Sequence, residues 1–172
     1  HKCMLMLENL DNTEVISALI KAGAEVNAKD VYGATPLLHG AMLNGEVVSL
    51  LIKEGANINA RNEDGDTPLL IAAYINPNKE VLSILIKAGA NASSRDEIGA
   101  TPLMYAVMTN TSHTIEVISL LIKSGADVNA RDEASNTALI AAAALNANPE
   151  VLSVLIKAGA NINARNTENG TP

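Results

Sequence analysis

The 172-residue chain has almost no aromatic side chains, and this scarcity excludes one kind of binding site. Aromatic residues make up 2% of the sequence, as three tyrosines without phenylalanine or tryptophan. Proteins hold single-stranded nucleic acids by stacking the bases on aromatic rings, so no such platform is expected. Positive charge is scarce too, because 12 lysines and arginines face 19 aspartates and glutamates, for a net charge of −7. Nucleic-acid binding depends mainly on neutralising phosphates, so we expect no nucleic-acid partner.

Cysteine, long apolar runs and dense charge are lacking as well. The single cysteine, Cys3, has no partner for an internal disulfide, and one thiolate is too few for a zinc cage. No apolar run approaches the roughly 18 residues that a membrane-spanning helix needs, so we expect no membrane association. Hydrophobic residues make up 48% and charged residues 18%, a balance that excludes a disordered, charge-rich chain.

Two short motifs recur along the chain at matching intervals. Gly-Ala begins at Gly23, Gly55, Gly89, Gly125 and Gly159. Thr-Pro-Leu begins at Thr35, Thr67 and Thr101, continues as Thr-Ala-Leu at Thr137, and starts once more at Thr171. Both motifs advance in steps of 32, 34, 36 and 34 residues. Two markers in step at such a period indicate a chain built from structural repeats.

Each repeat is predicted to contain a loop or hairpin, a short helix, a turn and a second helix. Thr35 is a good N-cap and Pro36 a good first helical residue, and a run rich in small side chains follows them. The second helix, at residues 46–53 in this repeat, starts with a glutamate and ends with a lysine, which complements the helix dipole. Gly55 then suits the left-handed residue that ends this helix.

The order of residues within one repeat is specific. The repeat contains Asp30, Gly33 and Thr35-Pro36-Leu37, then Leu50-Leu51-Ile52 and Gly55-Ala56-Asn57-Ile58-Asn59-Ala60. In this order the chain resembles the ankyrin repeat family over essentially its whole length. The resemblance implies an all-α ankyrin repeat solenoid, in which helix-turn-helix units with β-hairpin-like loops stack on one another.

The repeats are expected to form a single ankyrin repeat domain over residues 1–172. We assign a partial repeat to 1–29, full repeats to 30–61, 62–95, 96–131 and 132–165, and the start of a further repeat to 166–172. The last second helix, residues 151–156, is as apolar as the inner ones. Terminal repeats need a polar outer face, so we expect further repeats or a capping segment after it.

The chain departs from the family pattern in three ways. Where the family usually has histidine after Thr-Pro-Leu, this chain has Leu38, Leu70, Met104 and Ile140, so we expect apolar contacts there instead of a hydrogen bond. Ser135 replaces the hairpin glycine of the fourth full repeat. The turns between helices are lengthened at Asn76–Lys79 and Asn146–Pro149, and most of all at Asn110–Ile115.

No residue pattern typical of an enzyme is found in the sequence. The three histidines, His1, His39 and His113, belong to different repeats. There is no metal-binding histidine pair on a helix, no phosphate-binding loop and no nucleophile elbow. The acids Glu63, Asp64 and Asp66 at one hairpin could bind a metal, although solvated turn acids account for them as well. We therefore predict a non-enzyme without cofactor or metal.

The resemblance implies a protein-binding surface on the hairpin tips and the exposed face of the first helices. The candidate partner-binding residues there are Tyr32, Met42, Leu43, Glu63, Asp64, Asp66, Tyr74, Ile75, Glu97, Ile98, Tyr105 and Met108. The equivalent helix-face residues of the fourth full repeat are Ala144 and Leu145. Met42, Tyr74 and Met108 share one position in the repeat and would form an exposed apolar stripe. Alternatively, neighbouring side chains cover them.

A cation also recurs once in each repeat, at Lys29, Arg61, Arg95, Arg131 and Arg165. Acids follow directly in several repeats, so these cations either form a ladder of surface ion pairs or present a site for an anionic partner. Exposed ion pairs of this kind contribute little to stability.

Three functions are compatible with these observations. The first is a non-catalytic module, expected to be monomeric, that binds a protein or an extended peptide through a concave groove. The second is a targeting or regulatory arm of a larger enzyme or effector, and the third is an architectural spacer. We expect a cytoplasmic location, or an intracellular one in a host if the protein is an effector.

Overall fold

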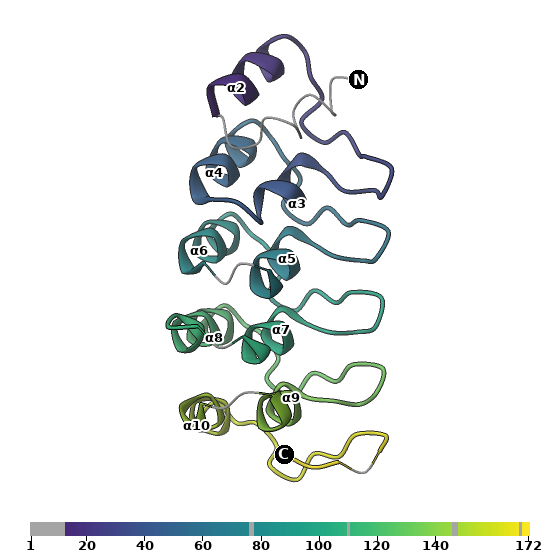
Figure 1. Ribbon diagram of the computed structural model, residues 1–172, viewed down its shortest axis with the longest axis vertical. Helices are drawn as coiled ribbons and strands as arrows, with labels where there is room; N and C mark the ends of the chain where they lie inside the picture. Colours follow the sequence, from purple (N-terminus) through teal and green to yellow (C-terminus); the bar gives the residue numbers. More distant parts are fainter. Residues whose placement is uncertain (1–12, 76–77, 110, 146–147, 169) are drawn as a thin grey trace. The chain divides into compact units, whose positions relative to one another are not determined.

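The computed structural model describes residues 13–75, 78–109, 111–145, 148–168 and 170–172 (Figure 1). Cys3 and His1 lie outside this range, as do parts of the three lengthened turns. The chain divides into two compact parts, residues 1–91 and 92–172. Each part is a stack of short helices whose loops project on one side.

In the first part, three second helices pack in sequence: α2 (Thr13–Lys21) on α4 (Gly45–Lys53), and α4 on α6 (Lys79–Lys87). The first helices are α3 (Pro36–Gly40) and α5 (Pro68–Tyr74), which pack on each other and on α4 and α6 respectively. Figure 1 shows α3 and α5 between the row of second helices and the hairpins.

The second part repeats the same arrangement. The first helices α7 (Pro102–Met108) and α9 (Ala138–Leu145) pack on each other, and the second helices α8 (Thr114–Lys123) and α10 (Pro149–Lys157) do the same. Within the described ranges of the chain there are nine helices and no strand. The prediction of an all-α repeat fold is therefore confirmed.

Small side chains allow the two helices of a repeat to approach closely. Ala41, Ala72 and Ala106 are fully buried. At Gly40, an added Cβ would lie 3.1 Å from Val47 Cγ1 and 3.2 Å from Leu51 Cδ1. The residues after Thr-Pro-Leu are buried as well, with exposures of 2% for Leu38, 1% for Leu70, 4% for Met104 and 6% for Ile140. The apolar environment expected in place of the family's histidine is thus confirmed.

Threonine caps most of the first helices, as predicted. The hydroxyls of Thr67, Thr101 and Thr137 accept hydrogen bonds from the backbone N–H three residues later, at 3.3 to 3.4 Å. Thr35 stands at the same position before α3 but makes no side-chain cap, so the prediction of a capping hydrogen bond there is wrong. Its Oγ1 is buried and has no hydrogen-bond partner within the described ranges.

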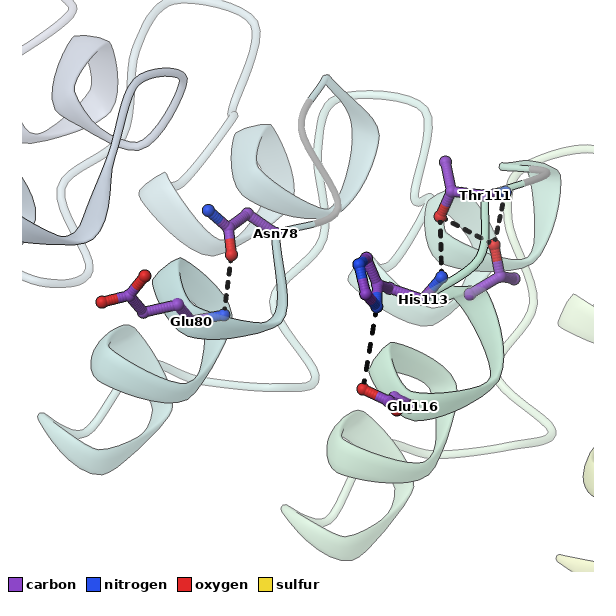
Figure 2. Close-up of polar contacts among 6 residues, drawn as sticks. Asn78, Glu80, Thr111, His113 and Glu116 are labelled. Atoms are coloured by element: carbon purple, nitrogen blue, oxygen red, sulfur yellow. Dashed lines mark hydrogen bonds and ion pairs between the residues drawn. The ribbon is translucent and has the colours of Figure 1, made fainter.

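Asparagines cap the second helices, which the sequence analysis did not foresee. Asn44 Oδ1 accepts a hydrogen bond from Val47 N at 3.0 Å. Figure 2 shows the same role for Asn78, whose Oδ1 accepts from Glu80 N at 2.9 Å at the start of α6. Asn148 does the same for α10. These side chains satisfy backbone N–H groups that the first turn of a helix leaves unpaired.

Helix α8 starts differently, because a threonine cluster replaces the asparagine. The hydroxyl of Thr114, a residue that is 2% exposed, accepts from Thr111 N at 3.0 Å and donates to Thr109 O at 3.2 Å. Thr114 Oγ1 also lies 3.3 Å from the hydroxyl oxygens of Thr109 and Thr111. Figure 2 shows Thr111 in this turn and His113 beside Glu116, with 3.9 Å between His113 Nδ1 and Glu116 Oε2. The longest turn between helices is therefore organised by hydroxyl groups.

Asparagines also join successive repeats within each part. Asn27 Nδ2 donates to Gly55 O at 3.0 Å, and Asn27 Oδ1 accepts from Asn57 N at 2.7 Å. Asn59 makes the equivalent pair of bonds with Gly89 O and Asn91 N of the next repeat. Asn129 makes it with Gly159 O and Asn161 N. The repeated asparagine that follows Gly-Ala in sequence is thus explained by bonds between repeats.

The hairpin turn requires a left-handed residue, and Ser135 is the exception to glycine there. Its φ is +60°, compared with +74° for Gly33 and +76° for Gly99. This conformation costs a residue with a Cβ about 1–2 kcal/mol. Ser135→Gly should raise the free energy of unfolding by about 1 kcal/mol, measured by urea denaturation.

The reverse exchange, Gly99→Ser, provides the matched control. Gly99 has a φ of +76°, which a residue with a Cβ rarely adopts, so the substitution should be destabilising. Equal stability of wild type and Ser135→Gly would show that the left-handed turn is not strained.

Candidate functional site

The predicted surface of residues 13–91 is formed by hairpin tips and the ends of α3 and α5. Tyr32 is 70% exposed, Tyr74 57% and Ile75 51%. Leu43 is 40% exposed, whereas Met42 is half-buried. Of the two residues of the predicted stripe in this part, Tyr74 is therefore exposed and Met42 is not. Exposed tyrosines are typical anchors at protein interfaces.

The acids predicted in this part have different surroundings. Glu63 and Asp64 are exposed at their hairpin tip, and Glu63 N donates to Tyr32 O at 3.0 Å, which joins the two tips. Asp66 is half-buried, and Asn62 Nδ2 donates to its Oδ2 at 3.3 Å. Asp66 therefore helps to hold its hairpin together, while Glu63 and Asp64 present their charges to solvent.

In residues 92–172 the hairpin tips and first helices enclose a groove of about 330 Å³. Its walls come from α7, α9 and the neighbouring hairpins, with these lining residues: Ile98, Ala100, Met104, Tyr105, Met108, Asp132, Asn136, Ile140, Ala141, Ala144, Leu145 and Asn166. We call it the α7–α9 groove. Its volume lies at the lower end of the range of sites that bind ligands.

Three of the predicted residues line the α7–α9 groove: Ile98, Tyr105 and Met108. Ile98 is 56% exposed and Met108 40%, and Leu145, equivalent by repeat position to Leu43 and Ile75, is 61% exposed. Glu97 is exposed at the hairpin tip but is not among the lining residues. Asp132 and Asn166 also line the groove and were not among the predicted binding residues.

The hydroxyl of Tyr105 has a partner within the protein. Tyr105 is half-buried and donates to Asp96 Oδ2. Asp96 Oδ1 accepts from Ile98 N at 3.0 Å and from Ala100 N at 2.8 Å. The Tyr105 hydroxyl thus fixes the hairpin to α7.

Asp30 has the equivalent role in the first part. Its Oδ1 accepts from Tyr32 N and Ala34 N, both at 2.9 Å, and its Oδ2 lies 2.9 Å from His39 Nε2 on α3. Burial raises the pKa of this carboxyl, but the bonds from His39 and the two backbone N–H groups together outweigh burial. The pKa of Asp30 is therefore below its usual value.

The recurring cations contact backbone carbonyls. Lys29 Nζ donates to Arg61 O at 2.9 Å, and Arg131 Nη1 donates to Arg165 O at 2.8 Å, so each side chain reaches the backbone of the next repeat's cation. Arg131 also bonds Ser135 O within its own hairpin, at 3.2 Å. The acceptors in these bonds are uncharged backbone carbonyls. The bonds therefore do not form the ladder of ion pairs that was one of the two alternatives for these cations.

In the described parts of the chain, no group of three or more histidine, cysteine, aspartate or glutamate side chains could hold a metal ion. None of the helices described is both long and apolar enough to span a bilayer.

Comparison with known proteins identifies the repeats. A family model described as ankyrin repeats, in three copies, matches residues 3–96 and again residues 70–166. A search of curated proteins found no match.

Proposed function

Because the chain belongs to the ankyrin repeat family, whose repeats generally serve protein–protein interaction and are generally non-catalytic, we propose that it is a non-catalytic module that binds a protein or an extended peptide. In this proposal the partner contacts the hairpin tips and the C-terminal ends of the first helices. These are the elements that would form a concave binding face.

The distribution of exposed apolar side chains carries the proposal. In the described ranges, ten large apolar side chains are exposed. Eight of them lie on hairpin tips or at the ends of first helices: Val31, Tyr32, Leu43, Tyr74, Ile75, Ile98, Met108 and Leu145. Only Ile156 and Ile162 lie elsewhere. Exposed apolar side chains that gather on one kind of element are typical of interaction surfaces.

Site-specific photo-crosslinking tests the proposal. A photo-reactive phenylalanine analogue replaces Tyr74 in one variant and Met108 in another, and replaces Lys123 on α8 in the control. We expect the same protein to be captured in lysate at position 74 or 108, and not at position 123. Capture only at position 123 would move the binding site to the second helices, and absence of capture at all three would favour an architectural spacer.

Direct binding of the purified captured protein gives the second measurement. Met108→Glu places a charge among the exposed apolar side chains and should weaken binding by about tenfold or more. Ile156→Glu is the matched control, because Ile156 is 49% exposed but lies on α10. Equal loss of affinity in both variants would contradict the proposed surface.

A further inference from the structure

Three aspartates occupy the same position in their repeats, and two of them are held by a donor from the following first helix. Asp30 Oδ2 is bonded to His39 on α3, and Asp96 Oδ2 to Tyr105 on α7. In both repeats the donor follows the aspartate by nine residues. The second carboxylate oxygen of each aspartate is therefore occupied from within the protein.

The third aspartate, Asp132, lacks this donor. The residue nine positions later is Ala141 on α9, whose methyl group cannot form a hydrogen bond. Asp132 Oδ1 accepts from Asn136 N at 2.8 Å, and Asp132 Oδ2 accepts from Asn136 Nδ2 at 3.0 Å. An ionised carboxylate has about four acceptor sites, so these two bonds leave Asp132 with further acceptor capacity.

The side chains around this carboxylate belong to the α7–α9 groove. Asp132, Asn136 and Ala141 all line the groove, as does Asn166, whose Nδ2 donates to Asn136 Oδ1 at 2.9 Å. Ala141 supplies no donor from α9, whereas His39 and Tyr105 donate from the first helix of their own repeats, so the only donor to Asp132 Oδ2 in the described chain is Asn136 Nδ2. Asp132 is half-buried there, and a carboxylate in partly desolvated surroundings attracts a cation more strongly than an exposed one does.

The net charge of residues 92–172 favours a cationic group as well. Residues 92–172 contain eight aspartates and glutamates against five lysines and arginines. The cation beside Asp132 in sequence, Arg131, donates to Ser135 O and Arg165 O. Beside the carboxylate, the groove offers Ile98, Met108 and Leu145, all at least 40% exposed.

We propose that the α7–α9 groove binds an extended peptide segment in which a lysine or arginine donates to Asp132 and a neighbouring aliphatic side chain contacts Ile98, Met108 and Leu145. This inference rests on the proposed function and specifies the chemistry of the partner. The peptide cation takes the place that an internal donor takes at Asp30 and Asp96.

A positional-scanning array of decapeptides tests the inference on the whole chain. We expect selection of lysine or arginine at one position, with leucine, isoleucine or methionine selected within a few residues of it. The best decapeptide is then titrated by calorimetry against the wild-type protein and three variants.

The first two variants either remove the charge of Asp132 or supply its carboxylate with a donor from α9. Asp132→Asn removes the charge and keeps an oxygen for the hairpin N–H, as Asn62 Oδ1 and Asn166 Oδ1 do at the equivalent positions. It gives up the bond from Asn136 Nδ2, so its urea unfolding midpoint is compared with that of the wild type. Ala141→His introduces the donor that His39 supplies in the first full repeat. Both substitutions should weaken binding of the decapeptide by about tenfold or more.

The third variant is the control. Ala143→His adds the same side chain to α9 at an exposed residue that does not line the groove, and affinity should stay within about twofold of wild type. Selection without a preference for cations, or a cation preference unaffected by Asp132→Asn, would overturn the inference. So would an array without any binding, whereas crosslinking at position 74 or 108 would then still support the proposed function.

Discussion

Replacing Leu85 by alanine is expected to lower the free energy of unfolding by about 2–5 kcal/mol. Leu85 lies on α6, which packs on α4 and α5, and its side chain is fully buried. Alanine removes the apolar contacts and leaves a cavity that short helices of a close-packed stack fill only in part. Urea denaturation followed by far-UV circular dichroism measures the change.

Tyr74→Ala is the comparison, because it removes a larger side chain from a first helix of the same part. Tyr74 is 57% exposed, so we expect a loss below about 1 kcal/mol. If Tyr74→Ala were the more destabilising substitution, Tyr74 would belong to the core and its assignment to the binding surface would be wrong. The pair therefore tests the packing and the proposed surface together.

Thr114→Val is expected to lower the free energy of unfolding by about 1–3 kcal/mol. Valine keeps the shape of the buried side chain but removes the hydroxyl that joins Thr111 N and Thr109 O before α8. Those two backbone groups then lose their partner in the turn, and an unsatisfied polar group costs more than an average hydrogen bond contributes. Thermal and urea denaturation measure the effect.

Thr114→Ser separates the hydroxyl from the methyl group. Serine keeps both hydrogen bonds shown for Thr114 and should cost about 1 kcal/mol, the value of one buried methyl group. A valine variant as stable as the wild type would show that these hydrogen bonds contribute little and that packing of the methyl group holds this turn.

Much of the fold could be predicted because each repeat carries its local signals in sequence. Proline after threonine places the start of α5 and α7, a lysine ends each second helix, and glycine supplies the left-handed residues after them. The capping prediction nevertheless failed at Thr35, since a residue type specifies the position of a cap but not whether its hydroxyl reaches an N–H.

The candidate site was only partly predictable. Ile98 and Met108 were found because hairpin tips and first helices recur at fixed positions in each repeat. Asp132 was not predicted, because it differs from Asp96 in having no donor at the residue nine positions later, Ala141. This difference becomes visible only when Asp96 is seen bonded to Tyr105. The sequence analysis left open whether Arg131 pairs with an acid or faces an anionic partner, and the structure shows Arg131 donating to the carbonyl of Arg165.

The sequence by itself determined the repeat, the order of helices and loops, and the residue types at each tip, because these depend on local backbone preferences that recur every 32 to 36 residues. The tertiary structure decided which of those residues are available to a partner. Met42 and Tyr74 share one position in the repeat, yet Tyr74 is exposed and Met42 is half-buried. Exposure and hydrogen-bond partners depend on which side chains of adjacent helices and hairpins meet, and the spacing within one repeat does not specify those contacts.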